Sequence, residues 1–501
     1  MSDTLVSNKH GIDGNTQATT SRLSGKMGSV ALMLTVLAFS APIAVVEGFI
    51  PFTILFDGPG ASFAFLITTF LLILFAIGYV TMARHVPKPG DFYSFISSGL
   101  GKVVGLGASF LSILSYLALL AGTYVFLGVS VSSLIQSLGG EVIPWQVFSL
   151  IGWLAVSILG YFHIEMSAKI LTVAMIVEVL IVVIYDVFVL SSGGAEGLSL
   201  EPMTPSAFMK GDMAVAMLYT TLVFLGFEAT ALFRDEVKDP DKTIPRATYG
   251  AVVFVGVLYT LSCYALVAAH GSEAWEIAKN SPTTMFSHSI GHYVAPIFEQ
   301  ITYCSVVLSL LAALISIHNV LSRYVLNLSV DRVFPTILSK VHSKHSSPHM
   351  ASISVSAVVI LSLMPFIINN FDGVTLYGLA VGLGGVGVIF LMAMVSLAAI
   401  VWFVRNGIPE SENVFKVFIA PGIACISMLF IDVFAMAHLD LVVGGKPGEN
   451  TWIIWLMLFT FVIGSSLAVY FRLAKPEIFN SLGRADRVFE FLAEKRMKGA
   501  Q

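Results

Sequence analysis

Three glutamates, Glu47, Glu178 and Glu228, lie deep inside apolar stretches of the chain. A carboxylate inside a bilayer is costly, so acids at such positions usually bind a cation, relay a proton or face a cavity. They are therefore the first candidates for functional residues. For Glu178 and Glu228, bracing one helix against its neighbours is an open alternative. Asp186 and Asp432 lie nearer the outer ends of their apolar stretches, and we expect interfacial or cavity-facing positions for them.

Two of these acids stand beside residues that interrupt helices. Pro42 lacks an amide hydrogen and clashes with the preceding turn, and it comes five residues before Glu47. Gly226 comes two residues before Glu228. Unwound backbone is tolerated at membrane depth only where it faces protein or a water-filled cavity. A break paired with an acid at both places predicts a site where free amides and carbonyls bind a small zwitterion or ion.

The elements that must position these residues are membrane-spanning helices. Of the 501 residues, 56% are hydrophobic and 12% are charged, and the mean hydropathy is +0.87. A helix needs roughly 20 apolar residues to cross a bilayer, and continuous rather than alternating apolar runs exclude barrel strands. We predict twelve spans, at residues 28–55, 61–84, 101–135, 146–162, 165–190, 211–234, 247–270, 296–326, 350–368, 373–404, 414–439 and 451–473.

Positive charge near helix ends tends to stay in the cytoplasm. With a cytoplasmic N-terminus, only Lys210, Lys279 and Lys446 fall outside, and the other basic residues lie on the opposite side. Residues 1–26 are polar and do not resemble a signal peptide, so we expect a cytoplasmic tail there. Residues 474–501 are expected to form a second cytoplasmic tail, either solvated or with a short interfacial helix.

The predicted breaks fall in the first and the sixth span. This spacing is expected if two five-helix halves pack as an inverted repeat whose broken helices meet at the membrane midplane. We therefore predict an all-α integral membrane protein with a five-plus-five inverted repeat and two further helices. The expected units are residues 27–190 and 191–404 for the two repeats and 405–473 for helices 11 and 12.

Three sequence elements resemble signatures of one family. They are "RHVPKPGDFYSFISSGLG" after the second span, "GFEATALFRDEVKDPDKTIPRA" at the sixth, and "NVLSRYVLNLSVDRVFP" at the eighth. In kind and order they are similar to motifs of the amino acid, polyamine and organocation (APC) transporters, of the bacterial amino acid permease type. The resemblance covers almost the whole chain. It implies a LeuT-like inverted-repeat fold and the transport of a small solute.

The chain departs from this family at two functional positions. Many members have a Gly-Ser-Gly run, which lets the backbone approach a substrate carboxylate, where this chain has Ala44, Val45 and Val46. Glu47 follows, and in the first turn of the outer half-helix it could take the place of that carboxylate, which would favour an amine. Putrescine-importing members are similar in having an acid five residues after the helix-breaking proline. Glu178 replaces a Lys that relatives often use in ion coupling, so the resemblance leaves coupling through an acid as a possibility.

We expect the substrate to lie between the two unwound segments, with its ammonium group on free carbonyls and on one or both nearby glutamates. Tyr116, in the third span, could cover it by cation–π attraction or by packing. Glu178 and Glu228 are the candidates for ion coupling. The expected substrate-binding residues are Ser40, Ala41, Pro42, Ile43, Ala44, Val45, Val46, Glu47, Tyr116, Phe224, Gly226, Phe227, Glu228 and Ala229.

The predicted function is secondary active transport of amino acids or related amines by alternating access, with spans 1, 2, 6 and 7 rocking against the other helices. A proton gradient is the expected driving force, and sodium symport and exchange are alternatives. A putrescine-like polyamine importer or exchanger is the alternative substrate class. A nutrient receptor that binds without transporting is the alternative from another class.

An enzyme and a channel fit the sequence less well. It contains no HExxH or GxSxG motif and no paired Asp motif, so we expect no catalytic residue and no cofactor. Cys263, Cys304 and Cys425 are too few and too scattered for a metal site. A channel would need repeated polar residues along one path. The expected partners are the substrate, a coupling proton or sodium ion and the lipids of the plasma (inner) membrane, with no nucleic acid; the oligomeric state is open.

Overall fold

The computed structural model describes residues 27–86, 92–162, 168–228, 230, 237–342, 348–443, 445–446 and 448–482. Within these ranges the regular structure is helical, apart from one isolated bridge between Met27 and Val237. Ten helical segments are long and apolar enough to cross a membrane. Two shorter apolar helices, Trp145–Tyr161 and Met213–Leu222, lie in two further predicted spans. The prediction of an all-helical membrane protein is confirmed, while the count of twelve spans and the inverted repeat stay predictions.

Ten of the helices follow the predicted spans with few changes at their ends. α11 begins seven residues before the predicted start at 247, because Pro240 occupies the first helical position, where its missing amide hydrogen is harmless. The eleventh span begins with a short π-helix, η6 (Phe415–Ile419). The ten helices are α4 (Ala61–His85), α6 (Lys102–Ser137), α7 (Trp145–Tyr161), α8 (Ala168–Ser192), α11 (Pro240–His270), α14 (Pro296–Val330), α15 (His349–Ile368), α16 (Gly373–Asn406), α17 (Ala420–Ala437) and α19 (Trp452–Ala474).

The first and the sixth spans are interrupted. The first consists of α1 (Ser29–Phe39), α2 (Pro42–Gly48) and α3 (Ile50–Asp57). Ala41 separates α1 from α2 in a left-handed conformation, with φ 49° and ψ 66°. In the sixth span, α10 (Met213–Leu222) ends twelve residues before the predicted end at 234. Gly226, with φ 111°, follows in a turn. Both predicted breaks are therefore present.

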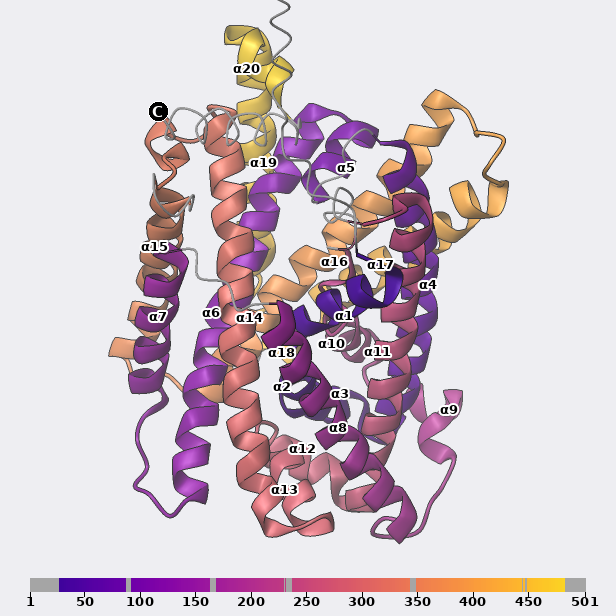
Figure 1. The fold of residues 1–501 in the computed structure, drawn as a ribbon, viewed down its shortest axis with the longest axis vertical. Coiled ribbons are helices and arrows are strands. Elements are labelled where there is room, and N and C mark those ends of the chain that lie inside the picture. The colour runs from indigo at the N-terminus through magenta and orange to yellow at the C-terminus, as the bar shows by residue number, and fades with distance from the viewer. Residues whose placement is uncertain are drawn as a thin grey trace, which may run out of the picture.

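The interrupted helices occupy the centre of the molecule, as Figure 1 shows. α1 packs on α11 and α8, α2 packs on α14 and α8, and α10 packs on α3, α17 and α4. α6 runs beside α16, α14 and α19. α7 and α15 form a pair at the edge of the bundle (Figure 1). The long helices thus enclose the two breaks.

Short helices cover both ends of the bundle, and apart from the one in the C-terminal tail they were not predicted from the sequence (Figure 1). α5 (Phe92–Leu100) and α20 (Pro476–Ser481) lie at one end, and α9 (Pro205–Phe208), α12 (Ala274–Asn280) and α13 (Met285–Tyr293) at the other. α12 is fastened to α3, because the indole Nε1 of Trp275 donates to the carbonyl of Leu55 at 3.0 Å. The remaining short elements are α18 (Leu439–Val443), η1 (Gly58–Gly60), η2 (Glu201–Met203), η4 (Gly271–Glu273) and η5 (Thr336–Ser339).

The end that carries α5 and α20 is held by charged side chains. Lys102, at the start of α6, donates to the carbonyl of Asn480 at 2.7 Å, at the end of α20. Glu412, whose side chain is 1% exposed, lies 3.1 Å from both Arg84 and Lys416. Arg84 also donates to the carbonyl of Asp241 at 2.9 Å, in the first turn of α11. This network joins α4, α11 and η6. The predicted tail helix corresponds in part to α20; residues 483–501 and 1–26 lie outside the described residues.

Candidate functional site

The first break places a backbone amide that has no partner within its own helix beside a buried acid. Ser40 bonds back to its own helix, donating from Oγ to the carbonyl of Leu37 at 2.7 Å. Ala41, which precedes α2, offers no side-chain cap to that helix. The amide of Ile43 donates instead to Oε2 of Glu178, on α8, at 3.3 Å. A carboxylate from another helix therefore caps α2.

Glu178 is fixed from a third helix as well. Its side chain is buried, and Oε2 also accepts a hydrogen bond from Oγ of Ser309, on α14, at 2.9 Å. The carboxylate thus ties α2, α8 and α14 together at the break. The residue predicted for ion coupling is a direct neighbour of the first interrupted helix.

The second break folds an acid back on its own backbone. The amide of Gly226 donates to Oε2 of Glu228 at 2.8 Å. The hydroxyl of Tyr79, on α4, donates to the carbonyl of Glu228 at 2.7 Å. The Tyr116 side chain, on α6, lies close enough to interact with the Glu228 carboxylate. Tyr116, Gly226 and Glu228, which the sequence analysis proposed as site residues, are brought together.

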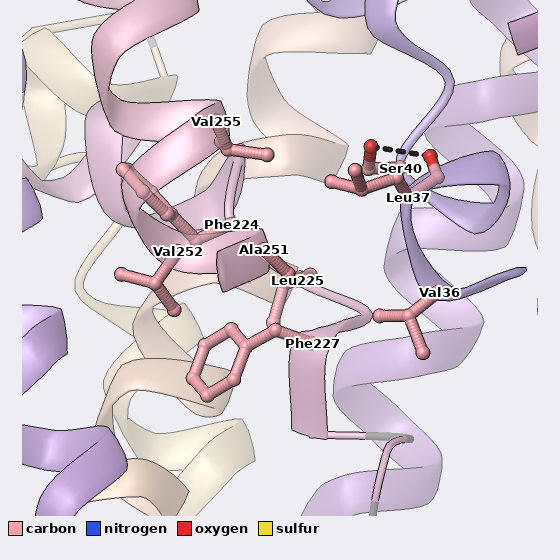
Figure 2. Close-up of a pocket in the computed structure, with 9 residues that line it drawn as sticks. All are labelled: Val36, Leu37, Ser40, Phe224, Leu225, Phe227, Ala251, Val252 and Val255. Carbon is pink, nitrogen blue, oxygen red and sulfur yellow. Dashed lines mark hydrogen bonds between the residues drawn. The ribbon is translucent and has the colours of Figure 1, made fainter. Parts of the chain in front are cut away.

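A small cavity lies between the two breaks (Figure 2). Its volume is about 10 Å³, and Ser40 is its one polar lining residue. Ser40, Phe224 and Phe227 were predicted as site residues. The other six lining residues, three of them on α11, were missed, since nothing distinguishes them from other apolar residues of their spans. The lining consists of Val36, Leu37, Ser40, Phe224, Leu225, Phe227, Ala251, Val252 and Val255.

The side chain of Glu47 contacts α13 and not the cavity between the breaks. It is fully buried, and its Oε2 accepts a hydrogen bond from the amide of Ser287, on α13, at 3.0 Å. Its second oxygen, Oε1, has no hydrogen-bond partner among the residues that the structure describes. Glu47 does not line the cavity between the breaks. It connects α2 to a short helix at one end of the bundle.

The expected position of Glu47 within its helix is wrong. It was expected in the first turn of the outer half-helix, after unwound residues Ala44 to Val46. α2 begins at Pro42, so Ala44, Val45 and Val46 are helical and buried, and Glu47 is the last residue but one. Proline at the first helical position sets this start. The carboxylate at the N-terminus of α2 is that of Glu178. Ala229 lies outside the described residues.

Several acidic side chains are buried in the part of the bundle that the structure describes. Asp186 and Asp432 are 7% and 1% exposed, so both side chains face the interior of the protein. Among the described residues, no Lys or Arg is buried. The buried ionisable residues other than Tyr and Cys are Glu47, Asp57, Glu178, Asp186, His318, Asp331 and Asp432. Two interrupted helices facing each other in an acidic interior, within a helical membrane protein, are features of a membrane transporter.

The comparison with known families agrees with this class. The sequence model of the family "Amino acid permease" matches residues 49–478, and the chain belongs to this family, within the APC superfamily. The resemblance seen in the sequence motifs is thereby confirmed. The protein is a transporter of the permease type and not an enzyme.

Individual relatives are distant. The chain is 23% identical over 395 residues to the branched-chain amino acid permease BcaP of Bacillus subtilis, covering 75% of this chain and 80% of that protein. It is 24% identical over 386 residues to the low-affinity putrescine importer PlaP of Escherichia coli K12, with the same coverage. The structure of MhsT in complex with L-phenylalanine superposes with a TM-score of 0.56 at 12% identity, covering 81% of this chain and 98% of MhsT. This likeness supports the LeuT-like fold.

Proposed function

We propose that the protein is a secondary active transporter that carries an amino acid or a related amine across the membrane by alternating access. The observation that carries this proposal is the pair of interrupted helices, which face each other across a cavity at the centre of the bundle (Figure 2). Family membership supports the same class of function. Transport requires no covalent chemistry, only a site that opens to each side in turn.

The size of the cavity supports a moving site. A volume of about 10 Å³ has room for no more than a single water molecule. An amino acid or an amine can therefore enter only if α1 and the segment after α10 separate. We propose that spans 1, 2, 6 and 7 move together, which would carry Glu228 and the Tyr79 that holds its carbonyl in the same direction.

The predicted site residues are proposed to meet the substrate as this space opens. Ser40, Ala41, Phe224, Gly226 and Phe227 lie at the breaks themselves. We propose that Oε1 of Glu47, unpartnered among the described residues, accepts a hydrogen bond from the substrate ammonium. Further proposed contacts come from the rest of α2, from the third span and from the residues next to Gly226: Pro42, Ile43, Ala44, Val45, Val46, Tyr116, Glu228 and Ala229.

Ion coupling is assigned to Glu178 in this proposal, with Glu228 as the second candidate. Glu178 contacts both α2 and α14, so a change in its charge alters the hydrogen bond that holds the first break. A proton is the proposed coupling ion, and sodium is the alternative. Location in the plasma membrane with cytoplasmic termini is likewise a proposal. The charge distribution supports it, since Arg84 and Lys102 lie at the end with α20, which would face the cytoplasm.

The test is uptake by purified protein in liposomes. Radiolabelled amino acids and amines are offered with and without an inward proton gradient, and counterflow is measured without any gradient. We expect saturable counterflow of at least one compound and gradient-driven accumulation of the same compound. Binding without counterflow would support the receptor alternative. Neither binding nor counterflow across the panel would contradict the proposed function.

A further inference from the structure

We infer that the substrate of the proposed transporter is an amine without a carboxylate group. The inference rests on the proposed function and narrows its substrate class. A transported amino acid needs a group that binds its carboxylate, and at a broken helix this group is ordinarily a free backbone amide or a basic side chain. In this chain the amides of Ile43 and Gly226 already have carboxylate partners, and no Lys or Arg is buried among the described residues.

At the first break, the amide of Ile43 in the first turn of α2 is occupied. Ile43 donates to Glu178, and the same carboxylate oxygen accepts from Ser309. The acid is therefore held by two donors from different helices. A substrate carboxylate could reach the Ile43 amide only by displacing the buried side chain of Glu178 from it.

At the second break, the arrangement is repeated with a local residue. The amide of Gly226 is exposed by the turn, and Glu228 takes it at 2.8 Å. The Tyr116 side chain also interacts with the Glu228 carboxylate. At each break, a carboxylate of the protein itself thus accepts a hydrogen bond from a backbone amide. The two carboxylates come from unrelated places in the sequence.

The ionisable residues of the interior also favour an amine over an amino acid. No Lys or Arg is buried among the described residues, whereas Glu47 and Glu178 are buried next to the first break. Placing like charges together in a protein site costs several kcal/mol, and opposite charges attract. An ammonium group suits this environment and a further carboxylate does not.

The apolar lining of the cavity indicates the chemistry of the rest of the substrate. Side chains from α1, α11 and the segment after α10 present hydrocarbon to the space, and Ser40 is the single polar residue. An amine with an apolar carbon chain is therefore the class that matches both the charges and the lining. A second ammonium group at the other end of the carbon chain is compatible with the other buried acids of the interior.

The experiment compares pairs of compounds that differ only in the carboxylate. The pairs are 1,5-diaminopentane with lysine and 3-methylbutylamine with leucine, measured by competition binding and counterflow on the full-length protein. We expect the amine of at least one pair to bind about tenfold more tightly than its amino acid, or better. Equal or tighter binding of the amino acids would overturn the inference while leaving transport intact. If no compound of either pair binds while an amino acid of the wider panel does, the inference fails; if nothing in that panel binds or exchanges, the proposed function itself fails.

Variants test whether the internal carboxylates cause the preference. Glu228→Ala frees the amide of Gly226, and we expect the ratio between amine and amino acid to narrow by several fold. Glu228→Gln is the matched control for the amide, because its side-chain oxygen can still accept from Gly226, and it should keep more of the preference. Glu178→Ala provides the same test at the first break if Glu228→Ala does not fold. An unchanged ratio in both alanine variants would overturn the role given to these carboxylates.

Discussion

The carboxylate of Glu178 accepts a hydrogen bond from the backbone amide of Ile43 at 3.3 Å, although 135 residues separate the two in sequence. The contact joins the fifth predicted span to the start of α2. An amide at a helix N-terminus favours a negatively charged partner, because the helix dipole adds to the hydrogen bond. The position of α2 and the charge state of Glu178 are therefore linked.

We expect Glu178→Gln to abolish accumulation driven by an ion gradient and to preserve counterflow. Glutamine keeps an oxygen for Ile43 and Ser309 but cannot take up or release a proton. Uptake into liposomes with inward proton or sodium gradients, compared with counterflow, measures the difference. Ser309→Ala removes one hydrogen bond and leaves the carboxylate, so it should remain coupled. Undiminished accumulation by the Gln variant would exclude Glu178 as the coupling residue.

Glu47→Gln should abolish amine uptake without separating α13 from α2. The side-chain oxygen of glutamine can still accept from the amide of Ser287, so α13 should stay attached to α2. The charge that would attract an ammonium group is lost. Substrate affinity and thermal stability are measured in parallel. Full affinity in the Gln variant would show that Glu47 serves only to attach α13.

Tyr116→Phe should weaken substrate binding by several fold, because the Glu228 carboxylate would lose its interaction with the Tyr116 hydroxyl. The ring remains, so any contribution from packing is retained. Tyr264→Phe is a matched control, since it removes a tyrosine hydrogen bond to the carbonyl of Ser199, outside the site. Isothermal titration of both variants gives the comparison. Similar affinities would place Tyr116 outside the binding machinery.

Glu412→Gln should lower the melting temperature of the protein. Its carboxylate is 1% exposed and pairs with Arg84 and Lys416, which are themselves partly exposed. We expect a loss of roughly 1–3 kcal/mol, below the value for a fully buried pair because water screens the two cations. Glu201→Gln is the control, because the Lys210–Glu201 pair is 66% and 60% exposed. Equal melting temperatures for the two variants would contradict the prediction.

Gly99→Ala should destabilise the contact between α5 and α16. A methyl group on Gly99 would lie 2.6 Å from the Cα of Ala398, which is backbone and cannot move aside cheaply. Gly422→Ala, in α17, is the control because nothing lies within 4 Å of its added methyl group. Alanine there should be neutral or stabilising by up to about 1 kcal/mol. Melting temperatures in detergent distinguish the two outcomes.

The sequence was sufficient to locate the breaks, because they depend on local chemistry. Pro42 begins α2, and Gly226 adopts the positive φ that other residues avoid. Tyr116 and Glu228, both predicted as site residues, also lie together, although 112 positions separate them in the sequence. Hydropathy and the distribution of charge along the sequence were likewise sufficient to predict the class of protein.

The partners of the acids could not be predicted, because they depend on packing between distant segments. Ser287, which binds Glu47, is 240 residues away in a joint that the sequence treats as a loop. Glu47 was misplaced for a local reason, since the helix starts at the proline and not after Val46. The α11 residues of the cavity carry no signal, as any face of an apolar span could turn inward.

The length of α7 has a consequence for the lipids around the protein. Its 17 residues span about 25 Å, whereas the hydrocarbon layer of a typical bilayer is about 30 Å thick. Ile151, Leu154 and Ile158 point outward from this helix. Hydrophobic mismatch of this kind draws the neighbouring leaflets together. We expect the acyl-chain length of the reconstituted lipid to change the turnover rate, with shorter chains suiting the edge formed by α7 and α15.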